Sequence, residues 1–106
     1  MVKMSELRNA EDLAQEELRD PEVRREYDRT AFANAVAIRV IGYRVEHGLS
    51  QSALARKLGI RQPTVARLEA GEHEPSLGTL ARLARGLGID FSIEITPHTL
   101  GLRDTA

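Results

Sequence analysis

Two short helical patterns joined by a turn of a few residues that includes a glycine constrain this chain more than any other feature of its sequence. The first pattern runs from Gln51 to Leu58, directly after Ser50, which is a good N-cap residue. Gly59 supplies the turn, because glycine adopts a left-handed backbone at little cost. The second pattern follows Arg61 and carries Pro63 in its first turn, where proline is tolerated. The apolar residues expected to pack between the two helices are Leu54, Ala55, Leu58, Ile60, Val65 and Leu68.

This joint spacing predicts a helix-turn-helix, a unit whose second helix lies in the major groove of DNA. An ordinary helical hairpin within a bundle is the alternative, and the spacing leaves it open. The charge distribution agrees with an anionic partner for the middle of the chain. Residues 31–86 hold eight Lys and Arg against four Asp and Glu, whereas residues 1–30 hold six against nine and residues 87–106 hold one against three.

Further helical patterns flank this unit. Asp20, Pro21 and Glu22 are typical of an N-cap, a proline at the first helical position and an acid in the first turn. We expect a helix from there at least to Tyr27, with a second start at Thr30, and an apolar continuation that ends at Gly48. Two other patterns carry apolar residues at helical spacing: residues 4–18, with a thin apolar stripe, and residues 75–88, which are rich in leucine.

Only one segment has the two-residue period of a strand. From Asp90 to Thr96, apolar residues alternate with polar ones, and Pro97 ends the pattern. A lone strand leaves its backbone groups unpaired, so we expect it to pair with its own copy across a twofold axis. The apolar residues assigned to this dimer strand are Phe91, Ile93 and Ile95.

Several function classes are excluded by what the sequence lacks. The absence of cysteine excludes a disulfide scaffold, a thiol nucleophile and cysteine-ligated metal sites. His47, His73 and His98 have no ligand spacing, so we expect no metal and no cofactor. No activated nucleophile or Gly-rich phosphate loop is present, and we expect no enzyme activity. No apolar run is long enough to cross a bilayer and no secretory signal is present, so we expect a cytoplasmic protein.

The positions of the polar residues within the helix-turn-helix predict which of them contact DNA bases and which contact phosphates. The exposed N-terminal face of the second helix should read bases, and its residues are Gln62, Pro63, Thr64 and Arg67. Gln62 suits adenine and Arg67 suits guanine, each through two hydrogen bonds. Ser50, Gln51 and Arg61 are assigned to DNA phosphates. The alternatives are a solvated surface charge for Arg67 and a simple capping role for Gln51.

The same region resembles the Cro/lambda-repressor (XRE) helix-turn-helix family over about residues 33–89. The resemblance lies in Gly48-Leu49-Ser50-Gln51, Leu58-Gly59-Ile60, Leu68-Glu69-Ala70-Gly71, Pro75-Ser76-Leu77 and Leu87-Gly88-Ile89. It implies an all-α domain of about five helices that binds operator DNA as a homodimer. It also implies an internal ion pair between Arg44 and Glu69. One departure is the acidic Glu72-His73-Glu74 loop, which makes phosphate contacts from that loop doubtful.

The outer segments resemble a narrower group. The stretch from Asp20 to Tyr27 resembles the N-terminal extension of antitoxins encoded beside RelE/HigB-type toxins, and the terminal strand resembles the dimerisation strand of HipB-like and some HigA-like antitoxins. This resemblance implies a toxin-binding extension over residues 1–29. The apolar residues assigned to the toxin are Leu7, Leu13, Leu18, Val23 and Tyr27.

We therefore predict four regions: an N-terminal helical extension (1–29), a helix-turn-helix domain (30–89), a dimerising strand (90–97) and a flexible tail (98–106). The function predicted is that of a type II antitoxin, which neutralises an mRNA-cleaving toxin of the RelE/HigB type and represses its own operon. No membrane and no small-molecule ligand is expected. A stand-alone transcriptional regulator is one alternative, and a protein-interaction module that no longer binds DNA is another.

Overall fold

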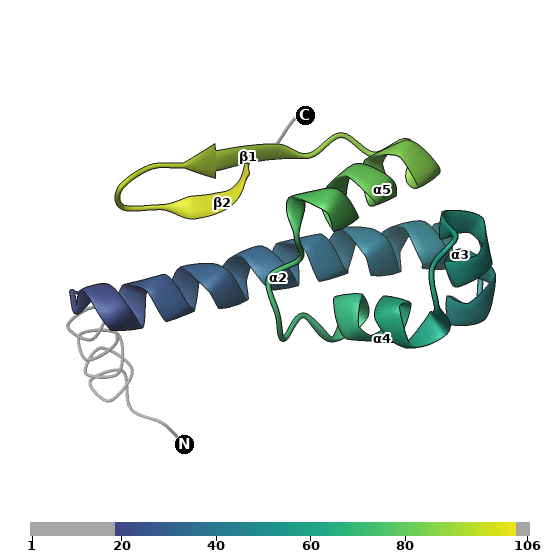
Figure 1. Ribbon diagram of the computed structural model, residues 1–106, viewed down its shortest axis with the longest axis horizontal. Helices are drawn as coiled ribbons and strands as arrows, with labels where there is room; N and C mark the ends of the chain where they lie inside the picture. The colour runs from purple at the N-terminus through teal and green to yellow at the C-terminus, as the bar shows by residue number, and fades with distance from the viewer. Residues whose placement is uncertain (1–18, 104–106) are drawn as a thin grey trace, which may run out of the picture.

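The computed structural model describes residues 19–103, which form four helices followed by a two-stranded hairpin (Figure 1). The elements in chain order are α2 (Pro21–Glu46), α3 (Gln51–Leu58), α4 (Gln62–Ala70), α5 (Leu77–Leu87), β1 (Ser92–Ile95) and β2 (Leu100–Arg103). In Figure 1, α2 runs along the molecule, with α4 on one side of it and α5 and the hairpin on the other. The helix expected over residues 4–18 lies outside the described residues, as do Leu7, Leu13 and Leu18.

Helix α2 is one continuous helix of 26 residues, so the prediction of a second helix start at Thr30 is wrong. The side chain of Asp20 caps the helix by accepting a hydrogen bond from the backbone N–H of Glu22 at 2.9 Å. The Thr30 hydroxyl instead donates to the carbonyl of Glu26 at 3.0 Å, which satisfies it inside the helix. The boundary predicted between residues 29 and 30 therefore falls within a helix and not at a break in the chain.

The three shorter helices begin and end at the residues that the sequence indicates. Ser50 caps α3 by accepting from the backbone N–H of Ala53 at 3.0 Å, and Ser76 caps α5 by accepting from Thr79 at 3.1 Å. Each of the three ends at a glycine with a left-handed backbone. The turn glycine between α3 and α4, Gly59, has φ of 68°. The helix-turn-helix geometry is thus set by local sequence.

The core lies between α2, α3, α4 and α5. Val40, Leu54 and Val65 are completely buried at its centre. They come from α2, α3 and α4 respectively, so each of these helices is anchored by one aliphatic side chain. The other buried members of the core are Phe32, Val36, Ala55, Leu58, Leu80, Leu83 and Leu87.

The C-terminal segment corrects the prediction of a lone strand. β1 pairs with β2 of the same chain in an antiparallel hairpin, with Ser92 opposite Arg103 and Ile95 opposite Leu100. A tight turn joins the strands, and within it the backbone N–H of Thr96 donates to the carbonyl of Thr99 at 2.9 Å. The segment predicted as a flexible tail therefore contains β2. The backbone groups along one edge of β1, which were expected to pair with a second molecule, pair with β2 of the same chain instead.

The hairpin also changes the fold class from all-α to mostly helical. Where the resemblance implies about five helices, residues 19–103 contain four, and the chain after α5 turns into strands. Phe91 and Ile93 are half-buried against the domain's own core, as are Leu100 and Leu102 of β2. Ile95, by contrast, is 74% exposed. Of the described helices, none is long and apolar enough to span a membrane.

Candidate DNA-binding interface

Helix α4 presents its N-terminal end at the surface while its opposite face is anchored in the core. Val65 is completely buried, whereas Arg61, Gln62, Pro63 and Arg67 are exposed. Pro63 and Arg67 are four residues apart and share one face of the helix. The structure thus leaves three of the four predicted base-reading residues exposed, with Gln62 and Pro63 in the first turn of α4 and Arg67 in its last turn.

A chain of side-chain hydrogen bonds links the start of α4 to the start of α3. The side-chain amide of Gln62 donates to the side-chain oxygen of Gln51 at 2.8 Å. The amide nitrogen of Gln51 in turn lies 3.5 Å from the Oε1 atom of Glu69, at the limit of a hydrogen bond. Gln51 was assigned to DNA phosphate from sequence, and here its side chain orients Gln62. Its backbone N–H remains in the first turn of α3, where helix N-termini favour anions.

The ion pair between Arg44 and Glu69 is present. Arg44 Nε donates to Glu69 Oε2 at 2.9 Å and Arg44 Nη2 donates to Oε1 at 2.9 Å, so the two groups meet in a bidentate arrangement. Arg44 Nη1 also donates to the carbonyl of Leu49 at 3.2 Å. The hydrogen bond to Glu69 raises the pKa of the Arg44 guanidinium above its ordinary value, although partial burial opposes this. The Arg44 guanidinium is therefore charged at neutral pH, and its bonds to Glu69 join α2 to α4.

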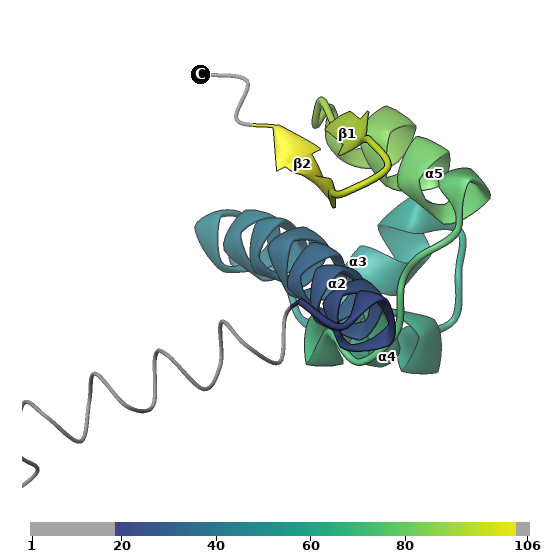
Figure 2. The ribbon, with the colours of Figure 1, turned by 90° about the vertical axis from the view of Figure 1, so that its left-hand side faces the viewer.

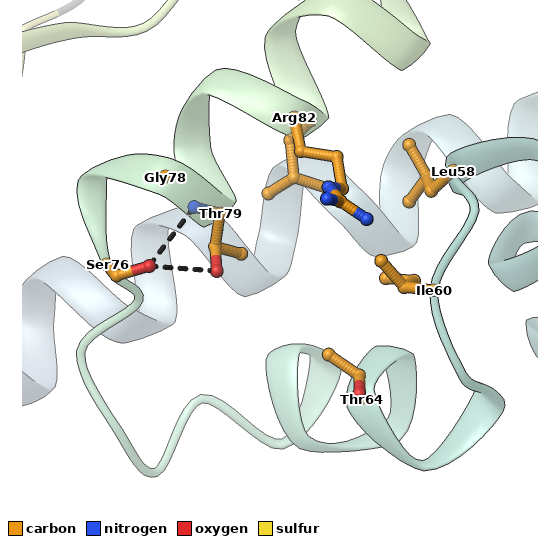
Figure 3. A pocket seen from close by; sticks show the side chains of 8 residues that line it. Leu58, Ile60, Thr64, Ser76, Gly78, Thr79 and Arg82 are labelled. Atoms are coloured by element: carbon orange, nitrogen blue, oxygen red, sulfur yellow. Dashed lines mark hydrogen bonds between the residues drawn. The ribbon is translucent and has the colours of Figure 1, made fainter.

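Thr64 lies differently from its predicted place. It is half-buried and, together with Ile60, lines a cavity of about 300 Å³ between the α3–α4 turn and the start of α5 (Figure 3). Residues 62 and 64 are two positions apart, so their side chains point to well-separated faces of a helix. Thr64 therefore does not share the exposed face of Gln62.

Arg82 of α5 was not singled out from the sequence, although it reaches the same cavity. Its Nη1 atom donates to the carbonyl of Gly59 at 3.2 Å, which ties α5 to the turn that aims α4 (Figure 3). The sequence shows only an arginine on the polar side of α5, and its partner is a backbone group 23 residues away. No local pattern predicts such a contact.

The residues assigned to DNA phosphates from the sequence differ in whether their side chains already make a hydrogen bond within the protein. The Ser50 hydroxyl caps α3 by accepting a hydrogen bond from the backbone N–H of Ala53. It can therefore contact an anion only in addition to this capping bond. Arg61 is exposed and makes no side-chain capping bond to α4. Glu72 and Glu74 are also exposed, and they place negative charge in the loop after α4. Among residues 19–103, no three His, Asp or Glu side chains are grouped to hold a metal ion.

Comparison with known proteins identifies this arrangement. The HTH_3 helix-turn-helix model matches residues 42–93. An uncharacterized HTH-type transcriptional regulator of Haemophilus influenzae is 34% identical over 88% of this chain and 92% of its own length. The chain belongs to the HTH_3 helix-turn-helix family. This HTH_3 protein is therefore a DNA-binding transcriptional regulator, and the predicted XRE-type resemblance is confirmed.

Two further comparisons extend the similarity of this HTH_3 protein to known proteins. Antitoxin HigA1 of Mycobacterium tuberculosis is 32% identical over 76% of this chain. The chain spans 54% of the length of that antitoxin. A crystal structure of an HTH_3 family transcriptional regulator from Vibrio cholerae matches with a TM-score of 0.53 and 30% identity, over 57% of this chain and 34% of that chain. The resemblance to HigA-like antitoxins is thus supported by sequence outside the helix-turn-helix as well as within it.

Proposed function

We propose that this HTH_3 regulator is an antitoxin that represses its own operon as a homodimer and binds a basic toxin of the RelE/HigB type. The observation that carries the proposal is the extent of the match to HigA1, which covers 76% of the chain. The HTH_3 match over residues 42–93 accounts for only part of that span. The shared sequence therefore includes chain beyond the DNA-binding unit.

In this proposal, α4 reads the operator. Arg67 donates two hydrogen bonds to guanine, Gln62 bonds adenine, and Pro63 makes apolar contact. Gln51 fixes the Gln62 amide at 2.8 Å, so that its side chain is oriented before DNA arrives. Arg61, Ser50 and the N-terminus of α3 contact phosphates and set the register. The pair of Arg44 and Glu69 holds α4 at the angle that this reading requires.

The toxin-binding role falls on the N-terminal part of α2 and the chain before it. Val23 is 39% exposed and Tyr27 is 55% exposed. These two side chains offer apolar contact outside the domain core. Residues 1–30 carry nine acidic against six basic side chains, which favours a basic partner. A toxin that binds RNA has such a surface, because it must attract phosphates.

A stand-alone regulator without a toxin is the second candidate. It is favoured by the Haemophilus influenzae relative, which matches over 92% of its own length and is named only as a transcriptional regulator. The DNA-reading residues would be the same in both cases. The two functions differ in whether the extension over residues 1–29, which includes Val23 and Tyr27, binds another protein.

Co-expression with the product of the adjacent gene tests the toxin. We expect a small basic protein to co-purify with the wild-type chain and to be lost from the variant carrying Val23→Asp and Tyr27→Asp. The matched control is Leu77→Asp, because Leu77 is an exposed apolar residue (74%) on another helix. A chain that purifies alone beside every neighbouring product contradicts the antitoxin role and favours the stand-alone regulator. A gel shift with its own upstream DNA at low salt tests DNA binding separately.

A further inference from the structure

Helix α2 carries an exposed apolar face opposite the domain core. Ile38 is 70% exposed and Val45 is 67% exposed, although both are large aliphatic residues. Ile41 is half-buried and Gly42 is exposed. The four residues stand at positions i, i+3, i+4 and i+7, so they form one continuous face over two turns. We call these four residues the α2 face.

Gly42 is not explained by the fold of the described chain. It lies in the interior of α2, where glycine weakens a helix relative to alanine. A methyl group built on it meets nothing within 4 Å among the residues that the structure describes. Gly42 therefore makes no close contact within residues 19–103. The close approach of a helix from outside the domain would explain Gly42, since small residues let two helix backbones come together.

The α2 face is complementary to itself. In an antiparallel crossing centred between residues 41 and 42, Ile41 of one copy lies against Gly42 of the other, and Ile38 lies against Val45. Each large side chain thus meets a small or matching one, which is the condition for an interface between identical patches related by a twofold axis. No charged side chain stands among the four residues, so an antiparallel partner buries none at the centre.

The same axis suits the DNA-binding unit. Figure 2 looks along α2, with α4 below it, the hairpin above it and α3 and α5 to one side. Among the described elements, none covers the remaining side of α2 (Figure 2). A twofold axis on that side, parallel to the line from the hairpin to α4, keeps both α4 helices on one face of the dimer. Both copies would then present Gln62 and Arg67 to the same DNA.

The hairpin adds to this contact. A stable dimer buries at least about 1,000 Å² in total, and one helix crossing is a small contact. β2 lies toward the uncovered side of α2 relative to β1 (Figure 2). Its outer edge has no strand partner within residues 19–103, and an open edge of this kind is a template for pairing. A second copy at the α2 face has this edge beside it.

We propose that the α2 face of Ile38, Ile41, Gly42 and Val45, together with the adjoining outer edge of β2, is the surface on which a second copy of this chain binds. The inference rests on the proposed function only in naming the homodimer, for which it supplies the helical contact. Tyr27 lies 15 residues from Gly42, about 22 Å along the helix. It stays clear of this contact and remains free for another protein.

The first test is the oligomeric state of the full chain by sedimentation equilibrium over a range of concentrations. We expect a dimer for the wild type and, for Ile38→Glu, a dissociation constant raised by more than about tenfold, because two carboxylates would be desolvated at the interface. Leu77→Glu is the control, since Leu77 is equally exposed at 74%. A wild-type monomer overturns the proposal, as does an equal dissociation constant for Ile38→Glu and Leu77→Glu.

Gly42 allows two sharper tests. Gly42→Leu should weaken the dimer, while its melting temperature at concentrations where both proteins are monomeric should be unchanged or raised, because leucine favours helix. The chain has no cysteine, so Gly42→Cys introduces one thiol, which we expect to cross-link two copies with a short bismaleimide. Gly78→Cys on exposed α5 surface is the control and should cross-link far less. Equal cross-linking of the two variants, or an undiminished dimer in Gly42→Leu, contradicts the proposal.

The experiments distinguish a failure of the proposed dimer interface from a failure of the proposed function. If Ile38→Glu is monomeric but the wild type shifts no DNA, the dimer surface stands and the regulatory role fails. If Ile38→Glu stays dimeric and instead loses a co-purifying protein, the α2 face belongs to that protein and this inference is overturned.

Discussion

Gly71 at the end of α4 lies directly against Asn34 of α2, so close that a methyl group on Gly71 would overlap the side-chain oxygen of Asn34. The same methyl group would come within 3.4 Å of the Asn34 Cα atom. Because α4 reads DNA in our proposal, this contact fixes the C-terminal end of the reading helix. The Arg44–Glu69 pair is a second link between the same two helices.

Gly71→Ala should destabilise the fold more than Gly88→Ala. Both glycines have left-handed backbones, with φ of 63° and 67°, which cost an alanine about 1–2 kcal/mol. Gly88 has open space around it, whereas Gly71 also meets Asn34. Urea unfolding of the two variants measures the difference. Equal free energies of unfolding would show that the chain relaxes around Asn34 without cost.

Arg67→Ala should weaken operator binding by about 1–3 kcal/mol if this side chain reads a base. Arg85→Ala is the matched control, because Arg85 is also exposed but lies in the last turn of α5. Fluorescence anisotropy with the upstream DNA measures both affinities at one salt concentration. Unequal losses across base substitutions in the operator are expected for Arg67 alone. Equal affinity of the Arg67 variant and wild type would remove it from the interface.

Removing both partners of the partly buried ion pair between Arg44 and Glu69 should cost less than removing one. Arg44→Met leaves the Glu69 carboxylate at 7% exposure without its guanidinium, whereas Arg44→Met with Glu69→Gln leaves no unpaired charge. We therefore expect the double variant to recover part of the lost unfolding free energy. DNA affinity should stay low in both, because neither retains the bidentate link that orients α4. A double variant less stable than Arg44→Met would contradict this.

Ile93→Asp should destabilise the domain itself by about 2 kcal/mol or more, because Ile93 packs half-buried against the core. Ile95→Asp is the control on the same strand, and its site is 74% exposed. We expect Ile95→Asp to change the unfolding free energy by no more than about 0.5 kcal/mol. Thermal unfolding at low protein concentration measures both. Similar losses would mean that Ile95, two residues further along the same face of β1, is covered as well as Ile93.

The helix-turn-helix was predictable because its signals are local. Ser50, Gly59 and Gly71 each act on the turn of backbone next to them, and the structure has helix ends at these residues. β2 was not predictable in the same way. Its sequence, Leu100-Gly101-Leu102-Arg103, is short and lacks β-branched residues. It becomes a strand because β1 and the core offer partners to it, and the turn at Thr96–Thr99 was the one local sign.

The candidate site likewise contains features that local sequence predicts and features that depend on tertiary packing. Exposure along α4 follows from helical position, so Gln62, Pro63 and Arg67 are exposed as the sequence predicts, although Arg67 lies in the last turn of the helix. Thr64 does not, because α5 approaches it from 12 or more residues along the chain and walls off a cavity. The Gln51–Gln62 bond and the contact of Arg82 with Gly59 also depend on how helices meet. Contacts of this kind are determined by how the helices pack, and they produce no periodic pattern in the sequence.

Helix α2 is continuous along its whole length, so no break in the helix separates its two ends. At about 1.5 Å per residue, its 26 residues span about 39 Å from Asp20 to the turn before α3. Its far end is joined to α4 through Arg44, and Arg39 donates a hydrogen bond of 2.7 Å to the carbonyl of Asp90, in the segment between α5 and β1. If a partner binds at Val23, as we propose, it is held on the same continuous helix that carries Arg44, so its distance from α4 is set by the length of α2.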